Sequence, residues 1–97
     1  MYEISNQIKD RKYDKLQVEI VVETPNYDIL SISLAKDTTF PNHSSPTDAQ
    51  LIVLEGDIEF HINGEAYHLQ KHQHFSFPKH TEHWVKSNVD SKFLIVR

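Results

Sequence analysis

Short runs in which apolar and polar residues alternate constrain the fold of this chain more than any other feature. Apolar residues occupy every second position over residues 16–22, 30–34, 58–62 and 75–77. A period of two places successive side chains on opposite faces of a β-strand, whereas an amphipathic helix repeats every 3.6 residues. The pattern therefore predicts an all-β chain of about eight short strands without a helix.

Turn residues separate these runs. Asn63-Gly64 is the strongest hairpin signal, because both residues tolerate the positive φ of a type I′ turn. Pro25-Asn26 ends the first run and indicates another hairpin. Residues 35–48 contain two prolines, which cannot donate into a central ladder, so this segment is predicted to be a loop that carries function. Turn signals at intervals of roughly 8 to 12 residues indicate a β-sandwich or barrel.

Length and charge limit the organisation and the partners. The 97 residues are predicted to form one domain, with residues 1–14 as an N-terminal arm and residues 15–97 as the barrel. The formal net charge is -4, and apart from a short stretch at residues 9–15 the basic residues are scattered. Because phosphate binding needs a concentrated positive face, a nucleic-acid partner is not expected.

Cysteine usage and the absence of long apolar segments exclude further classes. There is no cysteine, which rules out a disulfide framework and a thiolate metal site. The first residues lack a basic stretch followed by an apolar run, and no apolar run is long enough to span a bilayer. We therefore expect a cytoplasmic protein without a membrane partner.

Two segments resemble the conserved motifs of the cupin superfamily. Residues 43–56 begin with His43 and end after a strand at Gly56, which is similar to the first cupin motif. Residues 72–88 are similar to the second motif, with Pro78 and His83 in register. The resemblance implies a small single-domain cupin, a jelly-roll-like double-stranded β-helix forming a barrel of two antiparallel sheets.

The second segment departs from the cupin pattern at its turns. His72 and His80 stand where cupins have glycine, and Ser87 stands at the asparagine position, with Asn88 one residue later. Histidine is among the non-glycine residues enriched at positive φ, so both histidines are predicted to be turn residues rather than ligands.

The metal ligands of cupins are only partly present. The resemblance implies that three histidines and one glutamate converge inside the barrel, and His43 and His83 match the first and last of these histidines. Ser45 stands at the second histidine and Ala49 at the glutamate, so half of the ligand set is missing. His43 and His83 are therefore the candidate metal ligands, and the cofactor is either absent or a weakly held zinc, nickel or iron ion.

Alternation extends the candidate site to the cavity wall. If His43 points into the barrel, Ser45 shares its face, and Phe75 and Phe77 point inward together. The predicted ligand-binding residues are therefore His43, Ser45, Phe75, Phe77 and His83. His61, His68 and His74 are predicted to face outward.

Several functions fit this pattern. The first is a small cupin that binds a small molecule in its interior without the full ligand set. The alternative is a metal-dependent enzyme of the isomerase or dioxygenase type, in which His43 and His83 hold the ion with water and one further ligand such as Gln50. The pattern leaves open whether the protein is an enzyme, and His43 and His83 are equally compatible with an ordinary structural role. An open sheet edge also predicts a homodimer. If no ligand occupies the barrel, a purely structural role as a partner-binding dimer is the third possible function.

Overall fold

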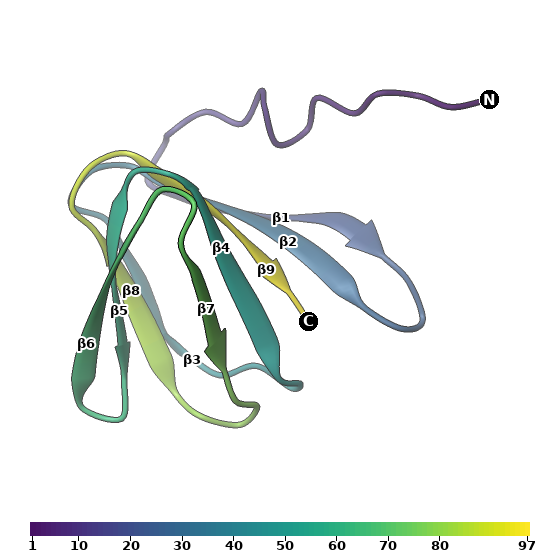
Figure 1. Cartoon of the computed structure of the whole chain (residues 1–97). Coiled ribbons are helices and arrows are strands. Elements are labelled where there is room, and N and C mark those ends of the chain that lie inside the picture. Colours follow the sequence, from purple (N-terminus) through teal and green to yellow (C-terminus); the bar gives the residue numbers. More distant parts are fainter.

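The structure, a computed structural model, describes all residues 1–97, and its only regular secondary-structure elements are strands (Figure 1). It contains no helix that could cross a membrane. The nine strands are β1 (Leu16–Glu23), β2 (Asp28–Leu34), β3 (Thr39–His43), β4 (Ala49–Glu55), β5 (Asp57–Ile62), β6 (Glu65–Gln70), β7 (His74–Phe77), β8 (His83–Ser87) and β9 (Ser91–Val96).

The strands form two antiparallel sheets that face each other. One sheet has five strands in the order β1-β2-β9-β4-β7, and the other has four in the order β3-β8-β5-β6. The predicted all-β fold of two antiparallel sheets is confirmed. No ladder joins the two sheets, so they form a jelly roll rather than one closed, hydrogen-bonded barrel.

The predicted turns are confirmed by their backbone angles. Asn63 and Gly64 have φ of 53° and 74°, which joins β5 to β6 through the expected tight hairpin. His72 and His80 also have positive φ, at 70° and 56°. Both histidines therefore occupy the left-handed turn positions for which cupins use glycine.

Part of the segment predicted as a loop is a strand. Residues 39–43 form β3 at the edge of the four-stranded sheet, paired with β8 on one side only. The register of this pair shifts between Phe40 and His43, which is where Pro41 lies. A proline is tolerated at such an irregular edge, because its missing N–H removes no bond from a central ladder.

The core lies between the sheets, on the faces that alternation predicts. Ile58, Phe60 and Ile62 of β5 are at most 7% exposed, and the core cluster contains 14 buried apolar residues. Edge strand β1 differs, since Val18 and Ile20 point to the same side as the core but are 49% and 53% exposed. Figure 1 shows the β1–β2 hairpin projecting beyond the other strands, where the smaller sheet does not cover it.

Residues 1–15 contain no strand, and residues 7–13 of this arm contact the outward face of the five-stranded sheet. The Lys92 ammonium donates to the carbonyl of Ile8 at 2.8 Å and lies 3.6 Å from the Glu55 carboxylate. Tyr13 donates to the same carboxylate, and its ring lies 5.4 Å from the ammonium. Lys92 is only 5% exposed as a result, and its charge is compensated beneath the arm.

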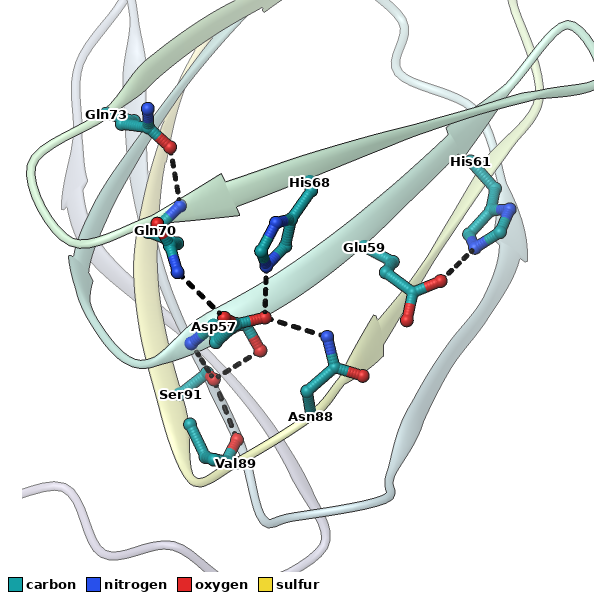
Figure 2. A network of polar contacts seen from close by, with 9 residues as sticks. All are labelled: Asp57, Glu59, His61, His68, Gln70, Gln73, Asn88, Val89 and Ser91. Carbon is teal, nitrogen blue, oxygen red and sulfur yellow. Dashed lines mark hydrogen bonds and ion pairs between the residues drawn. The ribbon is translucent and has the colours of Figure 1, made fainter.

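A polar network at the start of β5 joins three elements (Figure 2). The Asp57 carboxylate accepts from Asn88 at 2.7 Å and from Gln70 at 3.1 Å, and His68 lies 2.7 Å away. These bonds, led by that from Asn88, lower the pKa of Asp57. Ser91 accepts from the backbone N–H of Asp57 at 3.0 Å. The network thus attaches the β8–β9 turn to the start of β5. This end of the four-stranded sheet is the one remote from His83.

Candidate functional site

The inner faces of the two sheets line a small, mainly apolar cavity that is partly open on the side of β1. Its volume is about 190 Å³, and eight of its twelve lining residues are hydrophobic. The polar lining residues are His43, Ser45, His83 and Arg97. Because two imidazoles and a guanidinium meet an apolar wall here, this cavity is the candidate binding site.

Strand pairing brings the two predicted histidines together. His43 is the last residue of β3 and His83 the first of β8, and the two are direct partners in the ladder. Their ring centroids are 4.2 Å apart with the planes at 67°. The edge-to-face arrangement follows from the backbone register, so the sheet itself holds the imidazole pair.

Backbone carbonyls determine which imidazole nitrogen of each histidine is engaged and which is left free. Nδ1 of His43 lies 2.7 Å from the carbonyl of Pro41, and Nδ1 of His83 lies 3.0 Å from that of Thr81. A carbonyl oxygen only accepts, so each Nδ1 carries the hydrogen and donates it. Nε2 of each neutral ring then keeps a free lone pair, able to accept a hydrogen bond or to coordinate a metal.

Burial keeps His83 uncharged. His83 is 3% exposed, and desolvation lowers its pKa below the ordinary value of 6.5. The hydrogen bond to Thr81 opposes this shift, and the charge of a protonated His43 adds to it. Near neutral pH, His83 is therefore an acceptor at Nε2.

The other predicted ligand-binding residues divide into two groups. Phe77 lines the cavity, with its ring centroid 4.6 Å from that of His83. Ser45 also lines it, although its hydroxyl already donates to the carbonyl of Thr47 at 2.6 Å. Phe75 does not line it, because its ring packs on Phe60 with the centroids 4.9 Å apart.

Three aromatic or charged residues of the cavity lie outside the predicted ligand-binding set. Phe40 stacks on His43 with ring centroids 4.1 Å apart and planes at 16°, but it lies in the segment that we predicted to be a loop. Arg97 follows β9, and the alternation of Ile95 could have placed it on the inner face. Phe60, which stacks on His83 with centroids 5.1 Å apart, already belongs to a predicted alternating run.

The donor atoms near the histidine pair are few. Ala49 is fully buried and has no ligating group, and no three His, Cys, Asp or Glu side chains are grouped as metal ligands. The prediction of Gln50 as a third ligand is wrong. Its side chain lies on the outward face of β4, where Oε1 accepts from Ser76 at 2.6 Å.

A second hollow lies on the outward face of the four-stranded sheet. It is a wide, mostly polar groove of about 700 Å³, lined by Asn42, Glu82 and the stacked pair of His61 and Trp84 among others. The His61 and Trp84 ring centroids are 3.6 Å apart. This groove is larger than the inner cavity but open to solvent, so it encloses a ligand poorly.

Comparisons with known proteins agree with this architecture. The family model of the cupin domain matches residues 30–96. No curated protein matches the chain. Among solved structures, a conserved protein of unknown function from Streptococcus pyogenes is 27% identical with a TM-score of 0.78, covering 88% of this chain and 75% of that one.

Two further solved structures extend over almost the whole chain. An RmlC-like cupin protein from Desulfovibrio desulfuricans is 25% identical with a TM-score of 0.86, covering 99% of this chain and 95% of that one. A cupin superfamily protein from Desulfitobacterium hafniense is 12% identical with a TM-score of 0.84, covering 99% and 90%. The architecture is thus shared at low sequence identity.

Proposed function

Because this chain belongs to the cupin family, we propose that it binds a small, mostly apolar molecule between its two sheets, with His43, Ser45 and His83 as polar anchors. The observation that supports this function is the cavity of about 190 Å³, in which an apolar wall surrounds the imidazole pair. Apolar pockets with a few convergent polar groups are the usual form of small-molecule sites.

The volume limits the size of the ligand. An apolar cavity of about 150 Å³ is known to hold benzene. The cavity of about 190 Å³ therefore accommodates one six-membered ring with one or two small substituents. Phe40, Phe60 and Phe77 provide ring faces against which such a body can pack.

The histidine pair selects the polar group of the ligand. Nε2 of neutral His83 accepts a hydrogen bond, so a ligand hydroxyl or N–H is preferred over a purely apolar substituent. An acceptor left unpaired in this buried place costs about 1 to 3 kcal/mol, which an apolar ligand would not recover.

Calorimetry with phenol and benzene tests this proposal on the intact chain. We expect phenol to bind more tightly than benzene, and amide chemical shifts in β3 and β8 to change on phenol addition. His83→Phe should remove the preference for phenol. His72→Asn, which removes an exposed histidine at a turn, is the matched control and should leave binding unchanged.

Either of two results would overturn the proposal. One is that neither ring compound binds to the folded protein at millimolar concentration. The other is that binding is unaffected by His83→Phe and changes shifts only in the outward groove around Trp84, which would place the site on the outer face.

A metal-dependent enzyme of the isomerase or dioxygenase type is the second candidate function. One observation favours it. Both imidazoles donate a hydrogen bond from Nδ1 to a backbone carbonyl and leave Nε2 free, as metal-ligating histidines commonly do. Zinc sites normally use at least three protein ligands, and His43 and His83 supply two, since Ala49 has no donor and Gln50 faces outward. This donor set does not fit a standard metal site.

Elemental analysis separates the two candidates. Protein purified without a histidine tag should contain less than stoichiometric zinc, nickel and iron under the first proposal. A stoichiometric metal that is lost in the His43→Ala, His83→Ala double variant would instead establish the metal-dependent alternative.

A further inference from the structure

Arg97 is the cavity residue whose side chain lacks a hydrogen-bond partner. Its backbone continues the ladder beyond β9, because its N–H donates to the carbonyl of Asp28 at 3.0 Å and its own carbonyl accepts from Asp28 at 2.6 Å. Alternation from Ile95 places the side chain on the inner face, where it lines the cavity. The Arg97 side chain therefore lies at the margin of the apolar chamber, where it is 28% exposed and also lines a polar hollow beside Asp28.

The Nε–H of Arg97 is buried and makes no hydrogen bond. The nearest carboxylate oxygen is Oδ2 of Asp28, at 3.9 Å, which is an ion-pair distance but too long for a hydrogen bond. A buried donor without an acceptor is unfavourable, particularly when it belongs to a charged group. The guanidinium is thus available to an acceptor that enters the cavity.

The charges around the cavity define the acceptor that fits. Arg97 is the only cationic side chain in the lining, and no acidic residue lines the cavity. Guanidinium groups bind carboxylates through two parallel N–H donors, which a neutral acceptor cannot match. The chain as a whole carries a formal net charge of -4, so an anion gains attraction only from this local positive group.

We propose that the cavity ligand is a small monocarboxylic acid whose carboxylate pairs with Arg97 and whose ring or branched apolar body packs among Phe40, Phe60 and Phe77. A hydroxyl on that body would reach the free Nε2 of His83. This inference rests on the proposed small-molecule function and adds the chemical class of the ligand.

Asp28 gives the proposal a second, opposite test. Its carboxylate forms an ion pair with the Arg97 guanidinium and so partly neutralises the positive charge that attracts an anionic ligand. Removing the charge with Asp28→Asn should strengthen binding of an anion, whereas Arg97→Gln should weaken it. A merely structural role of either residue would not produce opposite effects on one ligand.

Calorimetry with benzoate and benzamide provides the measurement, since the two rings have similar shape and differ in charge. The protein should carry any tag at its N-terminus, away from Arg97. We expect benzoate to bind about tenfold or more tightly than benzamide. Arg97→Gln should abolish that advantage without weakening the binding of benzamide. Arg97→Lys should retain part of the advantage, because the positive charge remains but the two parallel N–H donors of the guanidinium are lost.

The outcomes distinguish this inference from the function on which it rests. If phenol binds in the cavity but benzoate has no advantage over benzamide, the carboxylate proposal is wrong and the small-molecule function stands. If phenol, benzoate and benzamide all fail to bind, both are wrong. If Arg97→Gln unfolds the chain, the comparison of benzoate with benzamide in Arg97→Lys and Asp28→Asn still decides the question.

Discussion

Burial of His83 links the stability of this fold to pH. Desolvation lowers the pKa of His83 in the folded chain below 6.5, the value it has when exposed to water. The folded state therefore takes up the proton of this residue less readily than the unfolded state. The sign of the linkage follows: His83 lowers stability as pH falls below 6.5 and has no such effect well above it.

We predict that His83→Gln reduces the loss of unfolding free energy between pH 7.5 and pH 5.5. Denaturant titrations of wild type and variant at the two pH values measure this difference. His72→Asn is the control, because His72 is exposed and its loss should leave the pH dependence unchanged. Equal pH dependence in wild type and His83→Gln would contradict the linkage.

At the scale of elements, the β4–β5 connection packs directly against the start of β9. Gly56 lies between the two strands with φ of 97°, and a Cβ there would lie 2.2 Å from Oγ of Ser91 and 2.5 Å from its Cα. Ser91 Oγ also accepts from the backbone N–H of Asp57, so it cannot move without breaking that bond. Glycine is required here both by its backbone angle and by the contact.

We predict that Gly56→Ala lowers the unfolding free energy by at least about 3 kcal/mol, because strain and overpacking add. Gly64→Ala is the matched control. Gly64 also has positive φ, at 74°, but no atom lies within 4 Å of the added Cβ. The control should lose about 1 to 2 kcal/mol from the backbone angle alone. Equal losses in thermal or urea unfolding would show that the contact with Ser91 does not matter.

At the scale of the whole molecule, the uncovered part of β1 has the properties of an interface. Val18 and Ile20 expose about half of their surface on the core-facing side, and β1 is an edge strand with one unpaired side. Open edges and exposed apolar rows favour pairing with another chain. Val18 also lines the cavity, so a second copy on β1 would help to close it.

We predict a homodimer formed through β1, with Ile20→Lys shifting it to monomer. Light scattering after size exclusion measures the mass, and circular dichroism checks that the strands are retained. Val89→Lys is the control, since Val89 is 44% exposed but lies in the β8–β9 turn. A monomeric wild type would refute the dimer, and a variant Ile20→Lys that stays dimeric would place the interface elsewhere.

Local pattern in the sequence determined most of the strand architecture. Alternation at Ile58, Phe60 and Ile62 predicted the buried face of β5, and Asn63-Gly64 predicted the β5–β6 hairpin. The positive φ of His72 and His80 was also predictable. These features depend on the period of a strand and on which residues tolerate a left-handed backbone, both of which act over a few neighbouring residues.

Tertiary structure alone decided how the site is completed. Strand β3, which contains Pro41, forms by pairing with the free edge of β8. This pairing places Phe40 and His43 in the cavity. Phe75 points inward as predicted but packs behind Phe60, so it does not line the cavity. Alternation specifies the face on which a side chain lies, but only pairing between strands distant in sequence determines which side chains meet there.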